Sequence, residues 1–286
     1  MIITSDFVLL NFPKTGSSFV RNVIKRAYKG SDSKWLKYTQ KLGLFQPWYE
    51  ELYLPKIDEA RNLGIRDQHG TWRQIPNRHR GKPVVSVSRN PFERYLSAYH
   101  YGWWKKYPPA DASELGRRFP GFPDISFPQY YEMIQTYACR DRLKGLSPKI
   151  PLGLHSIQFI QFYFRDPEAV LEKIDRQYID DRAFEGDMAD IHFLQQETLA
   201  DDLKQFLISL GRDEHSLSWL ENMERVNVTE RGRDSKGELE IMANNEIVSS
   251  ILSNDHLLFT LFPGYLPQSE AVDDVSLPGS EGECRA

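Results

Sequence analysis

The stretch Asn11–Phe19, with the sequence NFPKTGSSF, is the part of the chain that most narrows its fold. An apolar run, Phe7–Leu10, precedes it, and an amphipathic stretch, Phe19–Tyr28, follows it. This order predicts a buried strand, a tight loop and a helix. The first N–H groups of a helix have no intrahelical partner and favour anions. The sequence therefore predicts an anion-binding loop over residues 12–18.

The residue types in this loop suit an anion. Gly16 lets the backbone approach a ligand closely, and Lys14 adds a mobile positive charge. The hydroxyl groups of Thr15, Ser17 and Ser18 can donate hydrogen bonds or cap the helix. The loop is not a Walker A sequence, because its lysine precedes its only glycine. A capped helix with a solvated lysine is the alternative interpretation of the same residues.

A second strand, loop and helix follow at Pro83–Ser88 and Phe92–Lys106. The strand carries Val or small Ser on both faces, which is typical of a strand buried on both sides. Arg89 stands at the end of this strand, and Ser97 lies eight residues later, two turns into the helix. An arginine binds a phosphate through two parallel hydrogen bonds, and a serine adds another. Alternatively, Arg89 and Arg94 pair with surface carboxylates.

Further elements alternate along the chain. Ile191–Leu194 predicts a third buried strand, Glu197–Leu210 a helix that ends at Gly211, and Asp111–Phe127 a surface excursion. Other helices are predicted at Pro128–Tyr137, Leu154–Phe164, Pro167–Ile174 and Glu240–Phe262. Alternating strands and helices predict a single α/β domain with a mostly parallel central sheet and helices on both faces. Ligands in such sheets bind at the carboxyl ends of the strands, where both special loops lie.

The composition sets limits on function. The 286 residues are 40% hydrophobic and 27% charged, which is ordinary for a globular protein. The net charge of −4 does not suit a nucleic-acid-binding domain, so local cations must hold any anionic ligand. We expect residues 1–267 to form one domain and the acidic, Ser/Gly-rich residues 268–286 to be disordered.

The same composition predicts a cytoplasmic location. The chain has two cysteines, Cys139 and Cys284, which gives no disulfide framework. The first residues lack the basic segment and long apolar run of a secretory signal. No stretch approaches the roughly 18 apolar residues that a membrane-spanning helix needs.

Together the two loops resemble those of the PAPS-dependent sulfotransferases, whose sulfuryl donor is 3′-phosphoadenosine 5′-phosphosulfate. PKTGSSF at 13–19 is similar to the 5′-phosphosulfate loop, and RNPFERYLSAYHY at 89–101 is similar to the 3′-phosphate element. The resemblance covers about residues 5–265 loosely and is close only over 12–19 and 84–101. It implies the sulfotransferase fold, which is like that of P-loop NTPases, and transfer of a sulfuryl group from PAPS to an acceptor hydroxyl or amine without a metal.

The resemblance also implies roles for individual residues. Lys14 would neutralise the leaving 5′-phosphate, and His69, twenty residues before Arg89, would take the acceptor proton. The implied contacts to PAPS, or to its product PAP, are Lys14, Thr15, Gly16, Ser17, Ser18, Phe19, Arg89, Ser97, Arg231 and Gly232. His100 and His155 are rival histidines, His100 lining the cleft or packing and His155 buried.

An acceptor pocket is predicted from aromatic side chains. Trp72, Tyr99 and Trp103 are the candidates, with Tyr101 and Trp104 nearby, although any one of them could instead belong to the core. Small-molecule, glycan, lipid and peptide-tyrosine acceptors all remain open, as does the oligomeric state.

Three positions depart from the family pattern. Asp67 stands where the cytosolic members often have a lysine, Gln196 where a tyrosine is frequent, and Phe19 where a tryptophan stacks on adenine. The sequence of the second motif, residues 89–101, is more similar to that of the carbohydrate branch of the family. Two other functions stay open: a P-loop kinase or NTPase, and a nucleotide-binding protein without catalytic activity.

Overall fold

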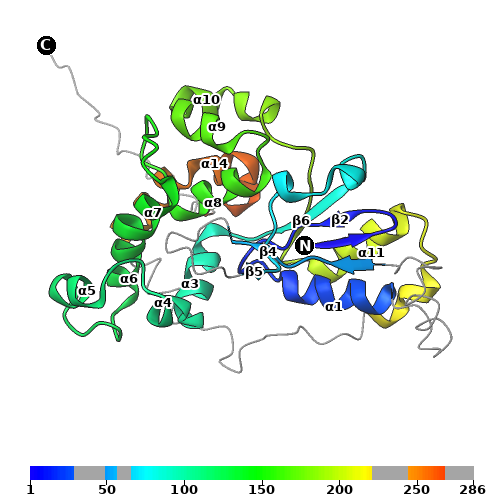
Figure 1. Ribbon diagram of the computed structural model, residues 1–286, viewed down its shortest axis with the longest axis horizontal. Coiled ribbons are helices and arrows are strands. Elements are labelled where there is room, and N and C mark those ends of the chain that lie inside the picture. The colour runs from blue at the N-terminus through cyan, green and yellow to red at the C-terminus, as the bar shows by residue number, and fades with distance from the viewer. Residues whose placement is uncertain (29–48, 57–65, 221–243, 268–286) are drawn as a thin grey trace, which may run out of the picture.

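The computed structural model describes four parts of the chain, residues 1–28, 49–56, 66–220 and 244–267 (Figure 1). The fold is α/β, with a mixed five-stranded sheet flanked by helices. The strand order is β3-β1-β2-β6-β7, with bounds Tyr49–Glu51, Ile2–Thr4, Val8–Leu9, Val84–Ser88 and His192–Gln195. The predicted ligand contacts Arg231 and Gly232 and the tail 268–286 lie outside the described residues.

The centre of the sheet is parallel, as predicted, but its amino-terminal edge is not. Strand β6 pairs in parallel with β2 on one side and with β7 on the other. Strand β1 pairs antiparallel with both β2 and β3. The prediction of a mostly parallel sheet is therefore wrong at this edge. Only residues 5–7 connect β1 to β2, and a parallel crossover needs a dozen or more residues.

A helix follows each of the three parallel strands: α1 (Ser17–Ala27), α3 (Pro91–Tyr101) and α11 (Leu199–Ser209). The predicted helix 92–106 is divided, because Gly102 has a left-handed φ of 68° and ends α3 before α4 (Trp103–Lys106) begins.

Apolar side chains pack on both faces of the sheet. Leu9 and Val85 belong to one cluster with the buried faces of α1 and α11. Val8 and Val84 belong to the other cluster, with the largely buried helix α8 (Leu154–Tyr163). Figure 1 shows α1 on one side of the sheet and α8, α9 and α14 on the other. The burial of β6 on both faces confirms the prediction for that strand.

Two predictions about burial are wrong. Strand β7 is only partly buried, with His192 and Gln195 exposed, because it forms an edge of the sheet. The segment 111–127 is more than a surface excursion: it contains α5 (Ala112–Arg118), and Leu115 and Phe119 are buried in the core.

The remaining elements complete the helical layer. They are α6 (Phe127–Met133), the π-helical turn η3 (Ile134–Ala138), α7 (Cys139–Leu143), α9 (Pro167–Lys173), α10 (Arg176–Asp180), α13 (Asn245–Asn254) and α14 (His256–Leu261). Strand β4 (Leu54–Pro55) pairs antiparallel with β5 (Arg66–Asp67), and short 3₁₀ turns are η1 (Trp72–Gln74), η2 (Asn77–His79), η4 (Ala183–Gly186), η5 (His215–Leu220) and η6 (Pro263–Tyr265).

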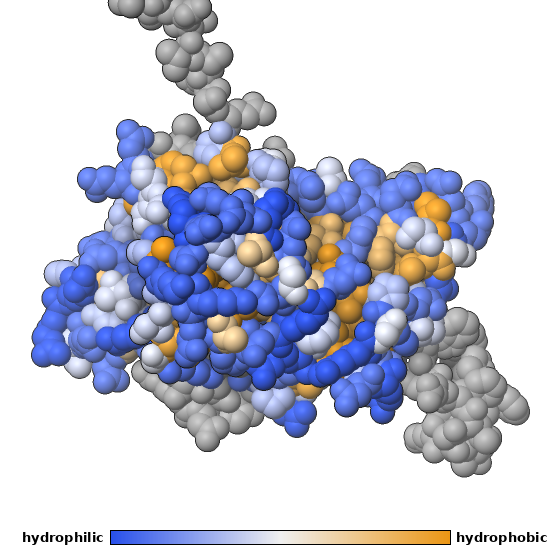
Figure 2. All heavy atoms as spheres, turned by 90° about the horizontal axis from the view of Figure 1, so that it is seen from above, coloured by the Kyte–Doolittle hydropathy of each residue, from blue (hydrophilic) through white to orange (hydrophobic). Residues whose placement is uncertain are grey.

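The surface is largely hydrophilic. On the face drawn in Figure 2, charged and polar residues predominate, and apolar side chains show in the hollows between them. Among the residues that the structure describes, no helix combines the length and apolar character that a membrane crossing requires.

Candidate active site

The two sequence motifs meet at the carboxyl ends of β2 and β6. The parallel pairing of these strands brings the loop before α1 next to the loop before α3. Nη1 of Arg89 donates a hydrogen bond to the carbonyl oxygen of Lys14 at 3.2 Å, so the two loops are in direct contact. The candidate site is therefore where ligands bind in sheets of this kind.

The first loop directs its carbonyl groups toward side-chain donors of the protein. His69 Nδ1 lies 2.7 Å from the carbonyl oxygen of Asn11. The hydroxyl groups of Thr15 and Ser17 donate to the carbonyl oxygen of Phe12 at 3.0 Å and 3.1 Å. These two hydroxyls were predicted to face a ligand, but in the structure they close the loop on itself.

The next two carbonyl groups accept from arginines. Nε of Arg94 donates to Pro13 at 3.0 Å, and Arg89 donates to Lys14. Four consecutive carbonyl oxygens, those of residues 11–14, thus each accept from a side chain. Carbonyl oxygens repel anions, so covering all four removes the main obstacle to an anion at this loop.

The backbone conformation leaves N–H groups for a ligand. Lys14 and Gly16 both have left-handed φ angles, 65° and 88°. When residues of left-handed and right-handed conformation alternate, successive N–H groups point to one side and form a concavity that can bind an anion. Gly16 is also the N-cap of α1, and no side chain caps that end. The left-handed φ favours glycine at this position, and a Cβ at Gly16 would also make a tight contact of 3.1 Å with the side chain of Leu199.

Lys14 and Arg89 concentrate positive charge beside this loop. Burial, and then the charge of Arg89, lower the pKa of Lys14 to about 8. Nζ of Lys14 lies 3.8 Å from the ring centre of Tyr101 on α3. Arg89 is held by Glu93, with Nε and Oε2 3.3 Å apart. Ser97 is half-buried between Glu93 and Tyr101 at four-residue spacing, which places it on the face of α3 that borders the loop.

Arg94 is a buried support of the loop, not a surface ion pair. It is 2% exposed, and its guanidinium lies 4.0 Å from the ring centre of Phe12. Besides Pro13, it donates to Oε1 of Gln158 at 2.5 Å. Burial lowers its pKa to about 9. The alternative pairing of Arg94 with a surface carboxylate is thus wrong.

Replacing Arg94 by alanine is expected to lower the free energy of unfolding by about 2–5 kcal/mol, because two buried acceptors lose their donor and a cavity opens. Arg73→Ala is the matched control, since Arg73 pairs with Glu168 at an exposed position. Its effect should stay within about 0.5 kcal/mol. Urea denaturation measures both variants, and equal stabilities would contradict a supporting role for Arg94.

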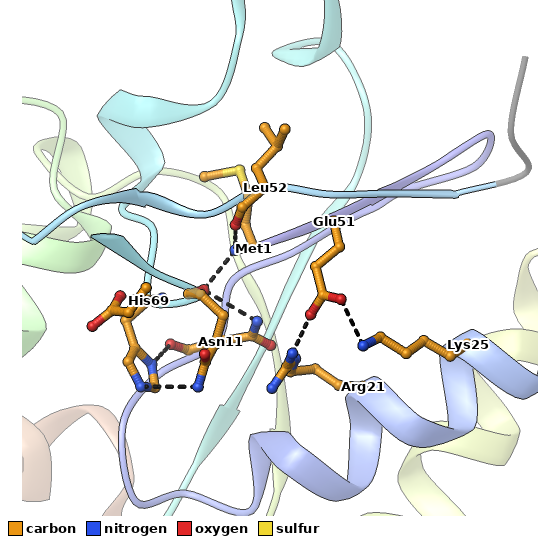
Figure 3. Close-up of polar contacts among 9 residues, drawn as sticks. Met1, Asn11, Arg21, Lys25, Glu51, Leu52 and His69 are labelled. Carbon is orange, nitrogen blue, oxygen red and sulfur yellow. Dashed lines mark hydrogen bonds and ion pairs between the residues drawn. The ribbon is translucent and has the colours of Figure 1, made fainter. Parts of the chain in front are cut away.

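His69 is fixed to the same loop (Figure 3). Its Nδ1 must carry the proton, because the Asn11 carbonyl can only accept, so Nε2 carries the lone pair that can accept a proton. The backbone N–H of His69 donates to Oδ1 of Asp67 at 2.7 Å. Burial lowers the pKa of His69, although the Asn11 carbonyl and Asp67 act in the opposite direction. His69 is therefore neutral at pH 7 and able to take a proton through Nε2.

The segment that carries His69 is anchored by further backbone contacts. The side-chain amide of Asn11 donates to the carbonyl oxygen of Gln68 at 3.2 Å. The nitrogen of Met1 donates to the same oxygen at 2.5 Å and to that of Leu52 at 3.0 Å. Figure 3 shows these groups between the first strands and the segment after β5. The side-chain amide of Gln68 lies 3.4 Å from Nε2 of His69, which is consistent with Nε2 as an acceptor.

The rival histidines lie in different surroundings. His155 is 2% exposed and packs against Tyr95, with ring centres 3.8 Å apart and planes tilted by 33°. Burial lowers its pKa well below the usual value, so it is a neutral core residue, as predicted. His100 is exposed on α3.

Not every predicted residue comes to the site. Phe19 is 6% exposed and packs in the core with α1, so its ring offers no free face for a base. Tyr99 donates its hydroxyl to Ile125 and packs within the helical layer, and Trp72 is half-buried against the same core. Trp103 is exposed. Arg231 and Gly232 lie outside the described residues.

Three other contributors were not predicted from the sequence. Arg94, Lys56 and the carbonyl of Asn11 enter the site through contacts that are distant in sequence.

No protein-family model matches this chain, and a search of curated proteins also gives no match.

Proposed function

We propose that this protein is a sulfotransferase that moves the sulfuryl group of PAPS to an acceptor hydroxyl or amine, on a sulfotransferase-type fold. One observation carries the proposal: four consecutive loop carbonyls are covered by side chains while Lys14, Arg89 and the N-terminus of α1 meet at the same point. This arrangement suits a ligand with a phosphosulfate at one end and a second phosphate nearby.

The two cations would divide the ligand between them. The N–H groups of residues 15–18 and Lys14 would hold the 5′-phosphate. Arg89 and Ser97 would hold the 3′-phosphate, which ATP lacks. The contact between Arg89 and the Lys14 carbonyl supports this division, because it fixes the separation of the two subsites. Glu93, which pairs with Arg89, keeps the guanidinium aligned until a phosphate binds.

PAPS supplies an activated sulfuryl group. His69 Nε2 takes the proton of the acceptor hydroxyl as the acceptor oxygen bonds to sulfur and the bond from sulfur to the 5′-phosphate oxygen breaks. Lys14 stabilises the negative charge that develops on that bridging oxygen, so PAP leaves as the 3′,5′-bisphosphate. The hydrogen bond from His69 to the Asn11 carbonyl links the proposed base to the loop that carries Lys14.

The function is tested by mixing the purified protein with PAPS and a panel of hydroxyl and amine acceptors and measuring PAP by chromatography. We expect PAP and sulfated acceptor in equal amounts with at least one acceptor. A parallel reaction with ATP and magnesium should yield no ADP. ADP formation in that reaction, with no PAP from PAPS, would instead favour a kinase or NTPase.

The pKa shifts predict a bell-shaped pH dependence of kcat/KM for PAPS, which reports on the free enzyme. Protonation of His69 removes the base, and its lowered pKa puts the acid limb below the usual histidine value of about 6.5. Lys14 loses its charge above its pKa of about 8, which gives the alkaline limb. Lys14→Arg should move the alkaline limb upward, because arginine stays charged. An alkaline limb that does not move would contradict the role of Lys14.

A further inference from the structure

Three exposed aromatic rings form a surface that we name the aromatic ledge: Tyr101, Trp103 and Tyr107. They are 62%, 43% and 40% exposed, at the end of α3 and along α4. The ring centres of Tyr101 and Trp103 are 6.3 Å apart with planes at 13°, and those of Trp103 and Tyr107 are 4.4 Å apart at 30°. Large aromatic side chains gathered at a surface mark an interaction site more often than a folding requirement.

A lysine accompanies each ring of the ledge. Nζ of Lys14 lies 3.8 Å from the ring centre of Tyr101, and Nζ of Lys56 lies 5.5 Å from that of Trp103. Nζ of Lys106 lies 5.4 Å from the ring centre of Tyr107. These lysines come from the loop after β2, from the chain after β4 and from α4. The ledge therefore combines flat apolar faces with positive charge.

The ledge is continuous with both proposed catalytic groups. Lys14 belongs to the anion-binding loop and lies over Tyr101 of the ledge. On the other side, Nζ of Lys56 lies 3.9 Å from Oδ2 of Asp67, and Asp67 accepts from the backbone N–H of His69. A ligand on Trp103 would thus be flanked by Lys14 and by the segment that carries His69. An acceptor must occupy this region if His69 is to take its proton.

We propose that the aromatic ledge binds the acceptor and that the acceptor is an acidic oligosaccharide. This inference rests on the proposed function. The rings offer flat surfaces for the C–H faces of sugars, and Lys14, Lys56 and Lys106 offer positive charge to carboxylate or sulfate groups. Lys105 pairs closely with Asp124, at 2.8 Å, and lies over Trp104 instead of over a ring of the ledge, whereas Lys56 is 3.9 Å from Asp67.

The openness of the ledge favours a saccharide chain over other acceptors. Small apolar molecules bind in cavities that bury most of their surface, whereas these rings are about half exposed. Extended peptides add to a strand edge or insert an anchor into a pocket, but the ledge lies on the end of α3 and on α4. A hydrated saccharide chain can rest on successive exposed rings and needs no cavity, strand edge or anchor pocket.

The test is binding of a hexasaccharide of alternating glucuronic acid and N-acetylglucosamine, without nucleotide, measured by calorimetry and tryptophan fluorescence. A neutral N-acetylglucosamine hexamer and a tyrosine-containing acidic peptide are the comparison ligands. We expect the acidic saccharide to bind most tightly, with an affinity that falls as salt rises. Trp103→Ala should weaken binding by about tenfold, and Lys56→Gln should weaken it and reduce its salt dependence. Trp219→Ala is the control, because Trp219 also has a cation over its ring, that of Arg26, but lies on η5.

The outcomes separate this inference from the proposed function. The ledge is not a site for acidic saccharides if the acidic hexasaccharide does not bind, if the neutral hexamer binds equally well, or if the peptide binds more tightly. The same holds if neither Trp103→Ala nor Lys56→Gln changes the binding of the saccharide. PAP binding by the same preparation would leave the proposed function standing in any of these cases. Saccharide binding that depends on Trp103, without PAP binding, would support the ledge and overturn the proposed function.

Discussion

His69→Asn is expected to lower the rate of sulfuryl transfer by about 10²–10⁴-fold, the usual contribution of a general base. Asparagine removes the Nε2 lone pair but retains an N–H group that can donate to the Asn11 carbonyl, as Nδ1 of His69 does. The anion-binding loop should then keep its shape, and the affinity for PAP should not change. Single-turnover formation of PAP measures the rate, and calorimetry measures the affinity.

Two further variants make the His69 result specific. His69→Ala also removes the donor to Asn11, so it should weaken PAP binding as well as transfer. His100→Asn is the matched control, since His100 is exposed on α3 and should transfer at the wild-type rate. A near wild-type rate for His69→Asn, or a large loss for His100→Asn, would show that another group takes the proton.

Lys14→Met should lower transfer by about 10²–10³-fold, the size of effect seen when one preorganised stabilising group is removed from a reacting oxygen. Methionine keeps an unbranched apolar chain against Tyr101, so the change isolates the ammonium group. The loss should appear mainly in kcat, because the charge on the bridging oxygen develops in the transition state. Steady-state kinetics over PAPS concentration separates kcat from KM.

Lys173→Met serves as the control for removing a lysine charge. Lys173 pairs with Asp187 in the helical layer and is remote in sequence from both loops. Its kcat should equal that of the wild type. If Lys14→Met raised KM alone and left kcat unchanged, Lys14 would bind the donor without stabilising the transition state.

The local elements were predictable because their signals are local. The strand ending at Leu9, the strand ending at Ser88 and the buried helix α8 follow from apolar runs and periodicity. The antiparallel hairpin that adds β1 was missed, because three-residue strands carry too little periodicity to be recognised. The break at Gly102 was also missed, since glycine can occur inside a helix and only its left-handed φ here ends α3.

The candidate site was predictable in its motifs but not in its support. Lys14 and Gly16 were found because they lie in one short motif, and Arg89 because it lies in a second. The parallel pairing of β2 and β6 brings the two motifs together. The supporting role of Arg94 was not predicted, because an arginine is seldom fully buried and its acceptor, the Pro13 carbonyl, lies 81 residues away in sequence. The inward direction of the Thr15 hydroxyl depends on the folded loop.

The role of an aromatic residue depends on its exposure, which the sequence does not give. Phe19 is on the buried face of α1, in the core. Tyr107, which no motif includes, is exposed and is part of the ledge. A large aromatic ring suits a core and an interaction surface equally well, so residue type alone does not separate the two. Only the packing of neighbouring elements decides which ring is covered.

The sulfotransferase assignment is tested most directly by a calorimetric titration of the purified protein with PAP, with 5′-AMP and magnesium-ATP as comparison ligands, repeated with Arg89→Ala. We predict that PAP binds at least about tenfold more tightly than 5′-AMP, because Arg89 adds a charge-assisted contact to the 3′-phosphate. In Arg89→Ala that preference should disappear. Equal affinity of the wild type for PAP and 5′-AMP, or tighter binding of magnesium-ATP, would contradict the assignment.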